Sequence, residues 1–160
     1  VVMRASDFGK TGHESPDELE ADAELKARVE QVRLAAGKLM NLGDVTKKTV
    51  PKMCLVGTPE HGGAISTRNF IPKKVHKAIG VFGAVSVATA CAYPGTVAAD
   101  IAGGGGTLGA RTLDIEHPTG HLEVEVELDR RSQPPAVIRS GVVRTARKLF
   151  DGTVFPRRIR

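Results

Sequence analysis

The chain has 160 residues, of which 41% are hydrophobic and 26% charged, and its formal net charge is +5. These values indicate one globular domain over residues 1–160 with a sizeable core, and the positive charge suits an anionic partner. The acidic residues are interspersed and only 4% of the residues are aromatic, which argues against a single-strand nucleic-acid binder.

Two cysteines, Cys54 and Cys91, lie in apolar sequence without a Cys or His at metal-ligand spacing. We therefore expect buried, reduced thiols and no metal, which favours a cytoplasmic location. The first residues lack the basic-then-apolar pattern of a secretory signal. The chain opens with Val1 rather than Met, which predicts a fragment or a processed product.

The first forty residues predict a short strand, a loop and a helix. Residues 1–4 are apolar and favour a strand, and residues 5–13 are loop-like. Ser15, Pro16 and Glu18 form the pattern of a helix start, with a capping box. An amphipathic helix that ends near Gly43 is predicted by apolar residues at three- and four-residue spacing: Leu25, Val29, Val32, Ala36 and Leu39.

Two strands are expected before the middle of the chain. Residues 47–52 form a basic connector, and residues 53–56 (MCLV) are typical of a short buried strand. Residues 57–63 contain Pro59, Gly62 and Gly63 and predict a turn. Residues 65–71 are rich in strand-forming side chains.

A small-residue apolar run from Ala78 to Ala92 predicts the central helix, which stops at Pro94-Gly95. The run is apolar on almost every face, so the helix is expected to be buried. It is shorter than the roughly 20 residues that span a bilayer. We therefore expect a helix wrapped by strands and no membrane partner.

Residues 96–102 are ambiguous between strand and loop. The glycine run 103–106 predicts a flexible loop, because the strand-like residues after it contradict a dinucleotide-binding fingerprint. Residues 122–128 alternate between apolar and glutamate side chains and predict a half-exposed strand that pairs with residues 113–115. Further strands are expected over residues 136–145 and 149–155, before a basic tail at 156–160.

The predicted fold class is therefore α+β. A mixed or antiparallel sheet is expected to wrap around the central buried helix, with the first amphipathic helix on the outside.

Two places are candidate anion sites. Lys73, Lys74 and Lys77 stand at the amino end of the predicted central helix, where free N–H groups attract anions. Gly120 and the hydroxyl of Thr119 belong to a turn, His117-Pro118-Thr119-Gly120, that can cradle a carboxylate. For both places a structural role without a ligand is the more common case. Charge runs are usually solvated, and such turns form without a ligand.

These motifs resemble those of the PrpF-type isomerases. The resemblance covers essentially the whole chain, and its strongest segments are PKKVHKAIGVFGAVSVATACAYPGTVA (72–98), IEHPTGHLEVEVE (115–127) and SGVVRTARKLFDGTVFP (140–156). The opening VVMRASDFGKTGHESPDEL and PKMCLVG are also similar. The resemblance implies one half of a diaminopimelate-epimerase-like fold, in which two similar domains each wrap strands around a helix.

The resemblance also implies a reaction. Such enzymes move or rotate a carbon–carbon double bond in acids such as aconitate and methylaconitate by proton transfer, without a cofactor. This chain resembles only their carboxy-terminal domain, and the proton-transfer residues are expected in the other domain. Residues 57–64 are shorter than the corresponding family loop.

By resemblance, Lys77 beside His76 grips a substrate carboxylate, Thr119 and Gly120 contact the substrate, and His121 lines the cleft. The expected partners are a small carboxylic acid and either the missing amino-terminal domain or a second copy of the chain. The alternative is a non-catalytic anion-binding or assembly domain. A nucleic-acid-associated protein, suggested only by the net charge, ranks last.

Overall fold

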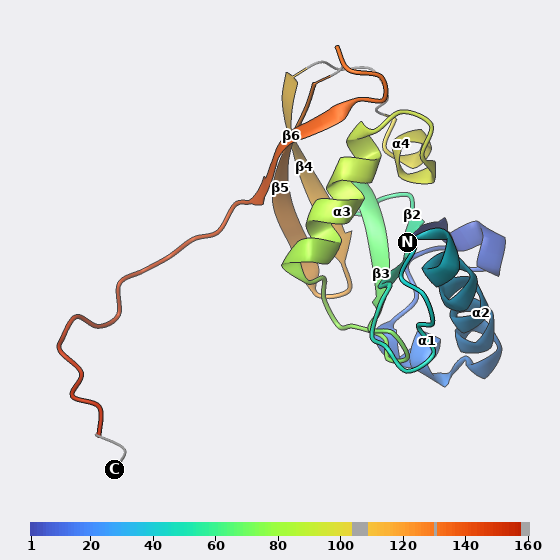
Figure 1. Ribbon diagram of the computed structural model, residues 1–160, viewed down its shortest axis with the longest axis horizontal. Coiled ribbons are helices and arrows are strands. Elements are labelled where there is room, and N and C mark those ends of the chain that lie inside the picture. Colours follow the sequence, from blue (N-terminus) through green and yellow to red (C-terminus); the bar gives the residue numbers. More distant parts are fainter. Residues whose placement is uncertain (104–108, 130, 158–160) are drawn as a thin grey trace.

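The computed structural model describes residues 1–103, 109–129 and 131–157. Six strands form one mixed sheet in the order of the sequence (Figure 1). They are β1 (Val2–Arg4), β2 (Met53–Gly57), β3 (Ile65–Phe70), β4 (Gly109–His117), β5 (Gly120–Asp129) and β6 (Ala136–Val142). The helices are η1 (Ala5–Phe8, a 3₁₀-helix), α1 (Pro16–Ala21), α2 (Ala23–Leu39), α3 (Val81–Ala92) and α4 (Val97–Ile101).

The sheet has helices on both faces of its first half. Side chains alternate along β2, so Cys54 and Val56 belong to the core under α3, while Met53 and Leu55 belong to a second core under α1 and α2. All five residues of β2 are buried. This explains why the strand reads as a continuous apolar run, as strands covered on both faces do.

The second half of the sheet is covered on one face only. α3 packs against β4, β5 and β6 and crosses in front of them in Figure 1. Leu122, Val124, Val126 and Leu128 of β5 are buried toward α3, whereas Glu123 is exposed. The predicted alternation of β5 is therefore confirmed.

α3 is the central helix, but its burial is one-sided in this chain. Ala84, Val87, Ala88 and Cys91 are fully buried against the sheet. On the opposite side Phe82 is 88% exposed. The central helix expected from the sequence is therefore present, and the mixed sheet lies against one face of it.

The first amphipathic helix is two helices rather than one that ends near Gly43. The Ser15 hydroxyl and the Glu18 carboxylate form the predicted capping box at the start of α1. The helix is interrupted at Asp22. The Asp22 carboxylate accepts a hydrogen bond from Leu25 N at 2.8 Å and caps α2. α2 ends at Leu39.

Two further segments differ from the sequence prediction. Residues 97–101 are helical, because the Thr96 hydroxyl caps them by accepting from Ala99 N. Residues 149–155 form no strand; Leu149, Phe150, Val154 and Phe155 are exposed, and a strand without a neighbour lacks its hydrogen bonds. The predicted loop at 103–106 and the basic tail at 156–160 lie partly outside the described residues.

Among the described helices, none is long and apolar enough to cross a bilayer.

A buried arginine holds the basic connector against α2. Arg33 is 0% exposed and makes two bonds to the Glu30 carboxylate, at 2.7 and 2.8 Å. It also donates to the backbone oxygens of Lys48 and Val50, at 3.2 and 2.6 Å. These bonds join α2 to the chain that enters β2.

Replacing Arg33 by alanine is expected to destabilise the domain by about 3 kcal/mol, because it leaves Glu30 and two carbonyl groups unpaired. Urea unfolding followed by circular dichroism measures the change. Gln31→Ala, on the exposed side of the same helix, is the control and should stay within about 0.5 kcal/mol of the parent. Equal effects of the two substitutions would contradict the buried arginine's role.

Candidate functional site

The candidate residues around His76 and Gly120 lie close together because two segments pair with the same edge of β3. β2 occupies one edge of β3 along its length. On the other edge β4 pairs in parallel with the first residues, Ile65 and Ser66. The later residues are paired by the chain that follows β3, through the Phe70–Val75 bridge and a 2.8 Å bond from His76 N to Asn69 O. His76 and the end of β4 therefore lie along the same edge.

The end of β4 is a tight hairpin. His117 pairs with Gly120, and Pro118 and Thr119 form the connection to β5. Gly120 has φ +145°, a conformation that side chains disfavour. The backbone N–H of Thr119 donates to His117 Nδ1 at 3.3 Å, and the Thr119 hydroxyl lies at the same distance. The predicted turn therefore forms, and Thr119 is an exposed residue in it.

Three histidines share an electrostatic environment at this place. Burial lowers the pKa of His117 below its ordinary value of 6.5, and the charges of His121 and His76 lower the pKa further. A histidine of one motif thus lowers the pKa of a histidine in the other, about forty residues away in the sequence. The structure brings His76, Thr119, Gly120 and His121 into one neighbourhood.

The lysines precede the central helix rather than occupy its first turn. The predicted helix start at Ala78 is corrected, since α3 begins at Val81 with Gly80 as its N-cap. Ala78 N instead donates to His76 Nδ1 at 2.9 Å. Lys73, Lys74 and Lys77 are exposed in the loop between β3 and α3. Lys77 follows His76 directly in the sequence. Its positive charge is therefore next to one of the three histidines described above.

Glu116 is a structural residue that sequence reasoning missed. Glu116 is 5% exposed, and its carboxylate accepts three backbone N–H bonds, from Glu60, His61 and Gly63, each at 2.8 Å. Burial raises the pKa of Glu116, but these bonds outweigh burial and hold the pKa below 4.5. Strand periodicity offers no signal for it, because the loop that buries Glu116 is more than fifty residues away.

The loop of residues 60–63, which Glu116 binds, forms one wall of a cavity of about 260 Å³ next to the hairpin. His61 and Gly63 line it from the loop, Asp114 and Glu116 from β4, and Gly120 and His121 from β5. Among the described residues no group of His, Cys, Asp and Glu is arranged to hold a metal ion.

The two cysteines do not belong to this site. Both are free and buried, as predicted. Burial raises the pKa of each thiol to about 12, so neither is a thiolate at neutral pH.

Comparison with known proteins agrees with this α+β domain. A family model described as "PrpF protein" matches residues 1–157. The chain is 56% identical over 156 residues to the (4E)-oxalomesaconate Delta-isomerase of Novosphingobium sp. (strain KA1), covering 97% of this chain and 42% of that protein. It is 51% identical over 155 residues to the 4-oxalomesaconate tautomerase of Pseudomonas putida (strain KT2440), covering 96% and 41%.

A solved structure supports the fold. The crystal structure of methylitaconate-delta-isomerase superposes with a TM-score of 0.70 at 20% identity, covering 89% of this chain and 43% of that one. The chain therefore belongs to the PrpF family. It spans less than half the length of these relatives.

The histidine group predicts a measurable titration. We expect the His117 imidazole to titrate below 6.5, and His76→Gln or His121→Gln to raise its pKa, because each substitution removes a positive neighbour. Proton–nitrogen NMR of the imidazole rings at varied pH measures this. His13→Gln is the control, since His13 is not among the groups that shift His117. An unchanged His117 pKa in both variants would contradict the proximity of the two motifs.

Glu116→Gln is expected to destabilise the domain by about 2–4 kcal/mol at pH 7, because an amide cannot accept all three bonds. The carboxylate's lowered pKa means that its stabilisation is present above 4.5 and is lost as the pH falls through the folded-state pKa. The gap between parent and variant should therefore narrow in acid. Urea unfolding at several pH values measures the gap, with the exposed Glu123→Gln as control.

Proposed function

We propose that this chain is the substrate-binding half of a cofactor-independent isomerase of unsaturated di- and tricarboxylic acids. Membership of the PrpF family supports the reaction class. Two relatives that share more than half of their aligned residues with the chain are named for oxalomesaconate. Acids of that kind are therefore the first candidates for the substrate, followed by aconitate and methylaconitate.

The observation that carries the proposal is the placement of two motifs on one edge of β3. The His76 segment pairs with that edge immediately beyond the end of β4, where the His117–Gly120 hairpin begins. A substrate with two or three carboxylates needs separate partners for them. In the proposal Lys77 binds one carboxylate as a point charge, and the Thr119 hydroxyl and the backbone at Gly120 bind another.

The histidines have a supporting role in this arrangement. His121 is exposed beside Gly120 and lines the cleft, and His76 orders the chain that carries Lys77 through its bond with Ala78 N. Because its pKa is lowered, His117 stays neutral near pH 7, so its Nδ1 accepts from the Thr119 backbone N–H and holds the turn in place.

The proton transfer is assigned to residues outside this chain. A base removes a proton next to a carboxylate, and the C–H electron pair forms an enolate-like anion. The double bond then shifts, and the proton is returned at the far carbon, so that no oxidant or cofactor is consumed. Positive and donor groups that hold the developing charge lower the barrier. Lys77 is the group of this chain suited to that task.

The partner in the proposal is the part of the relatives' length that this sequence does not span, or a second copy of the chain. A non-catalytic anion-binding or assembly domain is the second candidate, favoured by the exposed Lys73, Lys74 and Lys77, which can hold an anion without a proton transfer. The two candidates differ in whether adding the partner segment produces turnover.

We expect Lys77→Ala to weaken binding of trans-aconitate by about tenfold, because one charge-assisted contact is lost. Isothermal calorimetry measures the affinity. The matched control is Lys47→Ala, an exposed lysine in the connector before β2, which should bind as the parent does. Unchanged binding by Lys77→Ala would contradict its assigned role.

A second measurement addresses turnover. The chain is mixed with the segment of the Pseudomonas putida protein that it does not match, in deuterated water with trans-aconitate or 4-oxalomesaconate. Proton NMR should show deuterium uptake and double-bond migration only in the mixture, and Lys77→Ala should abolish both. Binding without exchange in the mixture would favour the non-catalytic domain.

A further inference from the structure

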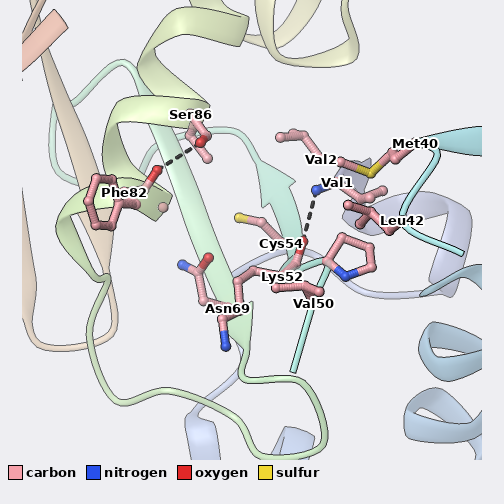
Figure 2. Close-up of a pocket in the computed structure, with 13 residues that line it drawn as sticks. Val1, Val2, Met40, Leu42, Val50, Lys52, Cys54, Asn69, Phe82 and Ser86 are labelled. Atoms are coloured by element: carbon pink, nitrogen blue, oxygen red, sulfur yellow. Dashed lines mark hydrogen bonds between the residues drawn. The ribbon is translucent and has the colours of Figure 1, made fainter. Parts of the chain in front are cut away.

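After β3 the chain turns back along the end of that strand. His76 N donates to Asn69 O at 2.8 Å, and Val75 lies opposite Phe70 in the bridge described above. Figure 2 shows Asn69 near the end of β3, from which the chain continues as a loop toward the first turn of α3. In an antiparallel pair, successive residues direct their backbone groups alternately toward and away from the partner strand. His76 N points toward β3, so Val75 N points away from it and needs another partner.

The partner of Val75 N is a side chain of α1. Glu20 Oε2 accepts from Val75 N at 2.8 Å, although the two residues are 55 positions apart in the sequence. In Figure 1 the chain between β3 and α3 passes beside α1, where this bond forms. The bond satisfies a backbone donor that β3 does not pair. One carboxylate thus connects the chain just before Lys77 to a helix.

Lys26 of α2 fixes the position of this carboxylate. Lys26 Nζ donates to Glu20 Oε1 at 2.6 Å and to the Glu20 backbone oxygen at 3.2 Å. The two oxygens of the carboxylate therefore have separate partners, one on α2 and one in the chain before α3. Lys26 and the Val75 N–H hold the pKa of Glu20 below its ordinary value of 4.5, so the carboxylate is charged at neutral pH.

The ion pair contributes little to the stability of the domain. The Glu20 side chain is 41% exposed and that of Lys26 is 30% exposed, and pairs in contact with water are worth little. Its specific effect is to restrain the backbone that leads to the exposed Lys77. A chain that is ordered before a ligand arrives loses less conformational entropy when the ligand binds.

We propose that Glu20 is a positioning residue for carboxylate binding by Lys77. This inference rests on the proposed function and adds to it a residue that does not touch the substrate. By accepting from Val75 N, Glu20 keeps the backbone of residues 75–77 beside the His117–Gly120 hairpin. The substrate carboxylate then meets a lysine whose backbone is already in place.

Charge and position make opposite predictions for Glu20→Ala. The substitution removes a negative charge, which by itself strengthens the binding of an anion. Loss of the bond to Val75 N should instead weaken trans-aconitate by about fivefold, because the ordering of this backbone becomes part of the binding step. Isothermal calorimetry on the 160-residue protein measures the affinity. Glu24→Ala, which removes an exposed glutamate of α2, is the matched control and should bind as the parent does.

Two conservative variants separate the reach of the side chain from its charge. Glu20→Gln loses the charge but keeps an oxygen that accepts from Val75 N, so it should bind within about twofold of the parent. Glu20→Asp keeps the charge but is one methylene too short for the bond. It should weaken trans-aconitate by about threefold, and it keeps the test valid if Glu20→Ala fails to fold.

A double variant and an exchange measurement test whether Glu20 acts through Lys77. In Glu20→Ala the amide hydrogen of Val75 should exchange about tenfold faster than in the parent, because its acceptor is lost. The variant with both Glu20→Ala and Lys77→Ala should bind trans-aconitate as Lys77→Ala alone does, since a residue that acts through a missing group adds nothing. A general loss of stability would add its effect in both backgrounds.

Several outcomes would overturn the inference while the proposed function stands. One is a Glu20→Ala protein that binds trans-aconitate at least as tightly as the parent while Lys77→Ala binds it weakly. Others are a Glu20→Gln protein as weak as Glu20→Ala, parental binding by Glu20→Asp, or additive effects in the double variant. Parental affinity in Lys77→Ala would contradict the proposed function itself, and the inference with it.

Discussion

The candidate site depends on how the edge of β3 opposite β2 is paired. A strand inside a sheet must pair both of its edges, because buried backbone N–H and C=O groups without partners are strongly disfavoured. β4 pairs with β3 only at Ile65 and Ser66. The chain that leaves β3 therefore turns back at Val75 and His76 to pair with the remainder. Pairing of these backbone groups thereby places His76 and Lys77 next to the His117–Gly120 hairpin.

The same requirement explains the loops around the site. Glu116 satisfies three N–H groups of residues 60–63 with one carboxylate, and its own backbone oxygen accepts from the Thr67 hydroxyl at 2.7 Å. One buried residue thus joins β4, β3 and a loop that has no regular structure. The hairpin begins at the next residue, so its position is fixed by a group that need not touch a substrate. Rigid support of this kind is what a binding site on a loop requires.

The sequence predicted the elements that depend on neighbouring residues. The alternation from Leu122 to Leu128 predicted β5, and the capping residues Ser15 and Glu18 predicted the start of α1. Features that depend on contacts between residues far apart in the sequence were missed. The strand expected at 149–155 has strand-forming residues but no neighbour among the described residues, and the burial of Glu116 depends on a loop far away in the sequence. For the site, the sequence indicated the residue types, but only the pairing along β3 places His76 beside the hairpin.

The central claim is that the Lys77 segment and the Thr119–Gly120 turn bind one ligand together. A titration of the nitrogen-15-labelled protein with trans-aconitate, followed by two-dimensional amide NMR, tests it most directly. The account predicts that the amide signals of Lys77, Thr119 and Gly120 move together and fit a single dissociation constant. Movement of one group alone, or of the two groups with different constants, would contradict a shared site.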